Sequence, residues 1–375
     1  KLYLCIDFGK LICINKQKRE MDYIEISGYK SIKNTRIDLA PINILIGANG
    51  SGKSNFTSFF DFLNRLYNRK LNEYVALKGG DNKILHKGKK NTDTISFKME
   101  FDNGQSGYSA KIQSGTDGFV FLNENLIYKG DSQSINKPGF EAQIKISDNH
   151  NAPCVIKYLN GFRKYHFHDT SLNSPFSKHS NIENDIYYFY EDGMNLAAFM
   201  YHIYETNKIV YNRIVKNIQS IAPYFSDFYF APSKENIIRL QWTDKYSDVV
   251  FGANDLSDGT LRFIALSVLF LQPNLPDTII IDEPELGLHP SAIAKLAGMI
   301  KSVSDRGCQV IVATQSTDLI SHFLPEDIIT VDQIDGQTVF ARLSSSNLKQ
   351  WLEDYTIDDL WKRNIITGGQ LNYKL

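Results

Sequence analysis

The segment GANGSGKS at residues 47–54 limits the possible folds of this chain more than any other feature of the sequence. It matches in full the pattern G-x-x-x-x-G-K-[ST] of a phosphate-binding loop. A short apolar run precedes it over 42–46, and apolar residues at helical spacing follow it over 55–66. Glycines between a buried strand and a helix let backbone amides and the helix N-terminus face a phosphate chain. A plain glycine turn is the alternative, and the strand–loop–helix context disfavours it.

This loop predicts a site for ATP and Mg²⁺. Lys53 is expected to reach the β- and γ-phosphates and to take part in catalysis, and the Ser54 hydroxyl is expected to hold Mg²⁺. The predicted nucleotide-binding residues of the loop are Gly47, Asn49, Gly50, Ser51, Gly52, Lys53, Ser54 and Asn55.

An acid pair follows a second apolar run, at residues 278–283. In a phosphate-loop ATPase the first acid of such a pair orders the Mg²⁺ shell, and the second polarises the attacking water. Asp282 is therefore the predicted metal-side residue, and Glu283 the candidate general base. A solvated strand end is the commoner meaning of such a pair in isolation, but the complete phosphate loop upstream favours the catalytic role.

Two further segments of the sequence are candidates to contact the γ-phosphate of a bound nucleotide. Ser257, Asp258 and Gly259 precede a helical pattern, and Ser257 suits an ordinary helix N-cap. The alternative that we favour is a signature loop, which binds the nucleotide of another subunit through these residues and the helix dipole. Gln315 follows the last apolar strand, over 309–313, and is a candidate catalytic sensor of the γ-phosphate, although it could also be a simple strand exit.

The pattern of the whole chain predicts an α/β fold. Alternating residues over 94–101 indicate an antiparallel strand, and this β-rich region is expected to continue through 142–146. One helix is predicted over 195–221. Strand and helix then alternate over 258–313, which is typical of a parallel sheet with crossovers.

These patterns divide the chain into five predicted regions. Met21 opens a clear strand pattern and is the expected natural start. The regions are a non-native or upstream extension over 1–20, an N-terminal head lobe with the phosphate loop over 21–160, a mostly helical insertion over 161–250, a C-terminal head lobe over 251–345 and a small helical cap over 346–375.

The order of the motifs carries a family resemblance. The phosphate loop, LSDGT at 256–260, IIIDEPELGLHP at 279–290 and ATQS at 313–316 together resemble the ABC ATPases of the RecF, SMC and OLD group. The sequence looks closest to stand-alone bacterial ATPases of this group, often met in phage-defence operons. The resemblance implies a phosphate-loop NTPase head. It also implies a homodimer or higher oligomer, in which two opposed chains form two composite ATP sites.

The sequence departs from the family pattern at three places. Asp258 and Thr260 stand where transporter-type signatures have Gly and Gln, and Gln315 replaces the switch histidine of many relatives. The last change predicts slow hydrolysis. No glutamine is evident in the usual loop between the two lobes, and the segment 85–88 lies near that place in the sequence.

Composition and the minor motifs disfavour several functional classes. The net charge of −1 gives no global case for nucleic acid, although a local basic face is compatible with it. The four cysteines form no CxxC pair, which fits a reducing cytoplasm, and no apolar run is long enough for a membrane span. A metal at His166 and His168 is disfavoured, because no further ligand cluster is evident. Core packing is favoured over base stacking for the aromatic segment 224–230.

The resemblance also suggests the biological role. Residues after Gln315 carry no Glu with a DxD constellation, so we expect no nuclease domain of the kind that OLD relatives carry. The expected function is an ATPase that senses or regulates for a separately encoded, nuclease-like effector in anti-phage defence. A RecF-like ATPase that binds DNA, or RNA, in repair is the alternative, and a transporter nucleotide-binding subunit is less favoured.

Overall fold

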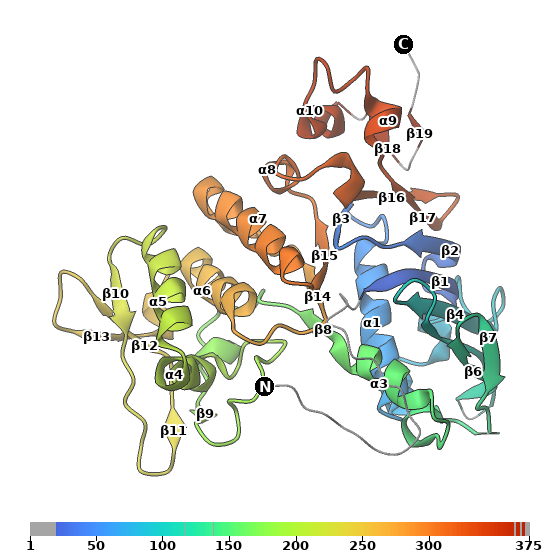
Figure 1. Ribbon diagram of the computed structural model, residues 1–375, viewed down its shortest axis with the longest axis horizontal. Helices are drawn as coiled ribbons and strands as arrows, with labels where there is room; N and C mark the ends of the chain where they lie inside the picture. Colours follow the sequence, from blue (N-terminus) through green and yellow to red (C-terminus); the bar gives the residue numbers. More distant parts are fainter. Residues whose placement is uncertain (1–19, 117, 138, 364, 368–369, 372–375) are drawn as a thin grey trace.

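The chain is described here from a computed structural model, which covers residues 20–371 apart from 117, 138, 364 and 368–369. The predicted extension over 1–20 and the end of the predicted cap therefore lie almost entirely outside the described residues. Figure 1 shows a central sheet with the phosphate-loop helix beside it, an antiparallel sheet on one side and a smaller lobe on the other.

The central sheet has six strands in the order β17-β16-β3-β15-β14-β8. β3, β15, β14, β8 and β16 run parallel, and β17 pairs antiparallel with β16. Parallel strands covered on both faces read as continuous apolar runs, and β3 is buried at every position. The strands are β3 (Ile42–Ile46), β8 (Phe162–Tyr165), β14 (Thr278–Asp282), β15 (Gln309–Thr314), β16 (Ile328–Ile334) and β17 (Gln337–Arg342).

Helices cover this sheet and connect its strands. The helix predicted after the phosphate loop is α1, and its buried face carries Phe56, Phe59 and Phe60. The two helices predicted after residue 257 are present as α6 and α7. The helices around the sheet are α1 (Lys53–Tyr67), α2 (Leu71–Leu77), α3 (Ala152–Gly161), α6 (Asp258–Leu271), α7 (Pro290–Asp305) and α8 (Thr317–Ile320).

The second sheet is antiparallel throughout, with the order β2-β1-β4-β5-β6-β7. Its residues alternate between buried and partly exposed, as β4 shows, so one face packs on the core that it shares with α1. The strands are β1 (Met21–Tyr29), β2 (Ile32–Asp38), β4 (Thr94–Phe101), β5 (Ser106–Ser114), β6 (Phe119–Tyr128) and β7 (Asp131–Ser134).

The prediction that this β-rich region continues through 142–146 is wrong. Residues Ile144–Ile146 form a 3₁₀ turn. The cause is the buried carboxylate of Glu124, which accepts hydrogen bonds from the backbone amides of Gln143 at 2.8 Å and Ile144 at 2.9 Å. These bonds take up the amides that a strand ladder would need.

The lobe over 166–256 contains helices and small sheets. The single helix predicted over 195–221 is in fact two helices, because Asn207 breaks it and its side chain caps the second helix by accepting from the Val210 amide at 3.1 Å. A three-stranded sheet, β10-β12-β13, follows. The elements are α4 (Leu196–Thr206), α5 (Lys208–Gln219), β9 (Ser180–Asn181), β10 (Phe225–Phe228), β11 (Ile237–Ile238), β12 (Gln241–Asp244) and β13 (Val250–Gly252).

This lobe is joined to the head by packing as well as by the chain. α5 packs on α6, and the aromatic segment expected to fill the core does so at Phe225 and Phe228, while Tyr229 is 44% exposed. β8, the first strand after the predicted boundary at residue 161, belongs to the central sheet. The lobe is thus entered from a strand that lies beside β14.

The end of the described chain adds short elements beside α8 and β16. They are α9 (Ser345–Leu348), α10 (Ile357–Lys362), β18 (Ile366–Thr367) and β19 (Gln370–Leu371). Within the described residues, no helix combines the length and the apolarity that a membrane crossing requires.

Candidate functional site

The phosphate loop is held in shape by glycines in positions that disfavour other residues. Gly50 and Gly52 have φ values of +79° and +114°, in the left-handed region that favours glycine. A Cβ on Gly47 would overlap the Val331 carbonyl oxygen, and one on Gly52 would overlap the Thr338 side chain. β16 and β17 therefore lie directly against the loop.

Lys53 lies inside the loop. Its side chain is buried, and its Nζ donates to the carbonyl oxygens of Gly47 at 2.6 Å and Ala48 at 3.0 Å. Burial lowers the pKa of Lys53, and the carboxylates of Glu283, Asp282 and Glu285 act against that shift. The ammonium group is thus close to three acids and to the backbone that would surround a phosphate.

The first turn of α1 offers backbone amides to a ligand, because its N-cap Gly52 supplies no side-chain cap. Ser54 is exposed there. Asn55 instead holds the loop from behind: its Nδ2 donates to Ser31 Oγ at 2.7 Å, and Thr338 Oγ1 donates to Ser31 Oγ at 2.6 Å. The structure thus gives Asn55 a supporting contact rather than a free side chain.

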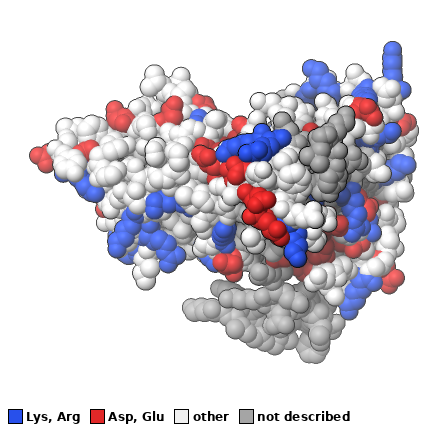
Figure 2. Space-filling model, turned by 90° about the horizontal axis from the view of Figure 1, so that it is seen from above, with Lys and Arg blue, Asp and Glu red and all other residues white. Residues whose placement is uncertain are grey.

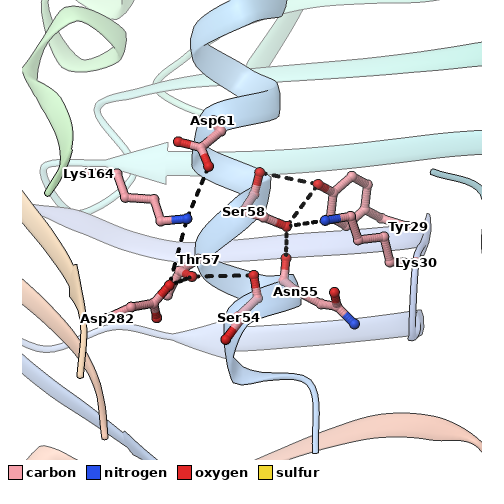
Figure 3. Close-up of polar contacts among 9 residues, drawn as sticks. All are labelled: Tyr29, Lys30, Ser54, Asn55, Thr57, Ser58, Asp61, Lys164 and Asp282. Atoms are coloured by element: carbon pink, nitrogen blue, oxygen red, sulfur yellow. Dashed lines mark hydrogen bonds and ion pairs between the residues drawn. The ribbon is translucent and has the colours of Figure 1, made fainter. Parts of the chain in front are cut away.

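Asp282 reaches α1 from the end of β14. Its Oδ2 accepts from Thr57 Oγ1 at 2.8 Å and lies 3.7 Å from Lys164 Nζ, as Figure 3 shows. Its Oδ1 is buried and has no hydrogen-bond partner among the described residues. A buried carboxylate oxygen without a partner is costly, and a hard cation such as Mg²⁺ would satisfy it. Asp282 therefore fits a Mg²⁺ ligand, and Ser54, exposed at the start of α1, stays the predicted second ligand.

Gln315 connects the acid pair to the phosphate loop. Its Nε2 donates to Glu283 Oε1 and, at 2.7 Å, to Asn49 Oδ1. Glu283 has a φ of +41°, and its amide donates to the Ala313 carbonyl at 2.7 Å, which ties the β14 exit to β15. A non-glycine residue in this region is uncommon and clusters at functional sites. The structure thus brings together three residues that the sequence analysis selected separately.

Glu285 is a site residue that the sequence analysis missed. Its Oε1 accepts from Thr314 Oγ1, its Oε2 is buried without a partner among the described residues, and burial raises its pKa. Its only signal in the sequence was a third acid in the run DEPE, and that signal does not distinguish a buried acid from a solvated one.

The segment that follows β8 also lies at the site, which the sequence did not predict. His168 lines a small cavity of about 10 Å³ together with Arg262, Asp282 and Glu283. Burial lowers the pKa of His168, and the nearby Arg262 guanidinium lowers it further. Residues 85–88 lie against the end of β1, where His86 Nδ1 is 2.8 Å from the Lys30 carbonyl oxygen. The described residues contain no cluster of three or more His, Cys, Asp or Glu side chains suited to a metal.

Arg262 joins this segment to the predicted signature helix α6. Its Nη2 donates to the His168 carbonyl and its Nη1 to the Leu286 carbonyl, both at 2.8 Å, and its Nε donates to the Phe167 carbonyl at 3.1 Å. One side chain therefore fixes α6 to the β8 exit and to the loop after the acid pair.

The predicted signature residues begin α6. Ser257 Oγ caps the helix by accepting from the Thr260 amide at 3.2 Å, so the expected N-cap is present. A Cβ on Gly259 would overlap the Gly287 carbonyl oxygen, and Asp258 is exposed. The segment 256–260 contacts α6 itself, the loop after the acid pair and, through Thr260 Oγ1 at 3.2 Å, the hydroxyl of Tyr224.

Comparison with known proteins identifies the family. Residues 42–321 match the family described as "AAA domain, putative AbiEii toxin, Type IV TA system", which is well over half of the chain. The chain belongs to this AAA-domain family. Over 72 residues the chain is also 35% identical to the Old nuclease of Escherichia phage P2, which covers 19% of this chain and 12% of that protein's length.

Solved structures confirm the predicted fold class for this AAA-domain protein. An Smc head bound to the C-winged helix domain of ScpA aligns with a TM-score of 0.60 at 17% identity, covering 88% of this chain and 99% of the other. An Smc head with an extended coiled coil, bound to the C-terminal domain of ScpA derived from Pyrococcus furiosus, aligns with a TM-score of 0.57 at 15% identity, covering 90% and 99%. The predicted relationship to SMC, RecF and OLD-like ABC ATPases is thus confirmed.

Proposed function

We propose that this AAA-domain protein binds and slowly hydrolyses ATP, dimerises around it, and regulates a separately encoded nuclease-like effector in anti-phage defence. The observation that carries the ATPase assignment is the arrangement around Gln315. This side chain links Glu283, the proposed base, to Asn49 of the phosphate loop. A base next to a phosphate loop is suited to activating a water for attack on the γ-phosphate.

Each residue has a distinct task in this proposal. Lys53 and the first amides of α1 bind the phosphates, and Glu283 accepts the proton of the attacking water. Gln315 holds Glu283 in place and senses the γ-phosphate. Mg²⁺, held by Ser54 and Asp282, would neutralise charge that develops on the phosphate oxygens.

Dimerisation is proposed because the family resemblance implies that the segment 256–260 contributes to another subunit's site. Ser257 and the α6 N-terminus carry no charged partner in their described contacts, and the helix dipole favours an incoming phosphate, which the exposed Asp258 carboxylate of the same turn opposes. Two chains in opposed orientation would then enclose two ATP molecules.

Glu283→Gln tests the site and the dimer together. Without the base, ATP is bound but not cleaved, so size-exclusion chromatography with Mg²⁺ and ATP should show a dimer that persists at least tenfold longer than that of the wild type. The wild-type chain with and without ATP is the control. A monomer at every protein concentration with ATP would contradict the dimer.

The effector is supported by the similarity to the Old nuclease of phage P2. The two Smc heads, whose structures hold ScpA domains, show that a head of this fold can bind a partner protein. Affinity purification of the tagged protein from its native host, with and without ATP, tests the proposal. Failure to recover a nuclease-like protein under either condition would contradict the effector.

A DNA- or RNA-binding ATPase is the second candidate. Figure 2 shows basic and acidic side chains interspersed over most of the face in view, with a group of basic side chains toward the left, on the side of the lobe that holds α4 and α5. Such a group suits phosphate backbones. Binding of a labelled duplex that weakens steeply with added salt would favour this candidate over a protein effector.

A further inference from the structure

Lys164 is a partly buried cation at the acidic centre, the group of carboxylates around Asp282, and the proposed mechanism assigns it no role. It lies on β8, opposite Ile280 of β14 in the parallel register, and its side chain is 17% exposed. Its Nζ is 3.0 Å from Asp61 Oδ2, on α1, and 3.7 Å from Asp282 Oδ2 (Figure 3). One ammonium group therefore lies between a helix carboxylate and the carboxylate that fits Mg²⁺.

The two oxygens of Asp282 are in different situations. Oδ2 is engaged by the Thr57 hydroxyl and by Lys164, whereas Oδ1 is buried without a partner among the described residues. Contacts on one oxygen fix the plane of a carboxylate and leave the other oxygen available to a ligand. Lys164 thus both orients Asp282 and neutralises part of its charge.

The charge of Lys164 also opposes an incoming cation. Charges a few ångströms apart in a partly buried site interact strongly, because water screens them little. Asp61 weakens this opposition, since it lies closer to Lys164 than Asp282 does. Asp61 is itself 45% exposed, so it can be changed with little disturbance of the core.

We propose that Lys164 is a positioning residue that sets how readily the acidic centre takes up a divalent cation, with Asp61 as the counter-charge that moderates it. This inference rests on the proposed function, because it takes Asp282 as the metal-side residue. Lys164 as a purely structural ion pair between α1 and β8 is the competing explanation, and it predicts a loss of stability without a change in cation dependence.

The test measures the free Mg²⁺ concentration that gives half-maximal binding of a fluorescent ATP analogue. In Lys164→Met this concentration should fall about tenfold, because a repelling charge is removed. In Asp61→Asn it should rise about threefold, because Lys164 is then free to pair with Asp282 alone. Lys164→Arg keeps the charge and should stay within about twofold of the wild type.

Two further variants show whether an effect is specific to the pair of Lys164 and Asp61. Lys157→Met removes an exposed lysine from α3 and should leave the Mg²⁺ dependence unchanged. The double variant Lys164→Met with Asp61→Asn should behave like Lys164→Met, because Asp61 acts through Lys164. Thermal unfolding of each variant without nucleotide reports stability separately.

The opposite signs of the two single variants decide the outcome. Shifts in the same direction, or none, overturn the inference, and Asp61→Asn still decides it if Lys164→Met does not fold. A wild-type protein that shows no Mg²⁺-dependent nucleotide binding overturns the proposed function instead, so the two failures are distinguishable.

Discussion

The phosphate loop and the segment over 256–260 have similar backbone features, but they differ in the side chains that contact them. Each begins a helix, and each has a glycine whose added Cβ would overlap a neighbouring element. The phosphate loop meets charged side chains of its own chain, including Lys53 inside it and Glu283 through Gln315. The other segment satisfies Ser257 within its own first turn. The contacts of Lys53 and Gln315 thus surround one loop with charged groups, whereas the contacts of Ser257 are local, and the proposed composite site takes the two segments as its complementary halves.

The largest effect expected from this difference concerns nucleotide binding by a single chain. Lys53→Ala removes the charge that is proposed to contact phosphate and should lower ATP affinity about 100-fold. Ser257→Asn keeps a good N-cap but changes the surface offered to a partner, so single-chain affinity should stay within about twofold while ATP-dependent dimerisation weakens about tenfold. Titration of a labelled ATP at low protein concentration separates these steps. Equal loss of affinity in both variants would show that the comparison is wrong.

The glycines should differ in their effect on stability. Gly52→Ala combines a positive φ with overlap against Thr338 and should cost about 3 kcal/mol. Gly259→Ala overlaps only the Gly287 carbonyl and should cost about 2 kcal/mol. Gly50→Ala is the matched control, because its φ is positive but its surroundings are open, and about 1 kcal/mol is expected. Urea unfolding gives the order, and a Gly50 variant less stable than the Gly52 variant would contradict it.

The smallest expected effect is a pH dependence from Glu285. Burial raises its pKa in the folded protein, so its favourable contribution is complete below the ordinary glutamate value of 4.5 and is lost as pH rises through the folded pKa. Between acidic and neutral pH the wild type should therefore lose about 1 kcal/mol relative to Glu285→Gln.

Glu326→Gln is a control for which the opposite pH dependence of stability is expected. Hydrogen bonds from Ser345 lower the pKa of Glu326, so its contribution is present at neutral pH and is lost as the medium becomes acidic. The wild type should accordingly gain stability relative to Glu326→Gln as pH rises. If the free energies of unfolding of the Glu285→Gln variant and of the wild type change with pH in parallel, the raised pKa of Glu285 is contradicted.

Local patterns were sufficient for the elements that carry the site. The strand before the phosphate loop, the helix after it and the strand before Asp282 were all predicted from residues that adjoin each other in the sequence. The family resemblance then gave the fold class, which solved Smc heads confirm.

Contacts between distant segments could not be predicted in this way. Arg262 and Lys164 read as ordinary charged residues in the sequence, and their roles depend on which carbonyls or carboxylates the fold brings near them. The same reason explains the error at 142–146, where a carboxylate from β6 captures two amides. Asn207 likewise interrupts an apolar periodicity that continues on both sides of it.

The strand order of the central sheet has a consequence for how the protein reaches its native state. Ile44 of β3 pairs with Val312 and Ile328, whereas most strand pairs of the antiparallel sheet join strands that follow one another in the chain, as Met99 with Tyr108. Distant pairings carry a larger loop-closure entropy and form more slowly. On a ribosome the antiparallel sheet can assemble early. In contrast, β3, which leads into the phosphate loop, can pair with β15 and β16 only when almost the whole described chain has emerged. We therefore expect nucleotide binding to be a late event in biogenesis, because a chain that ends before β16 lacks strands that lie against the phosphate loop.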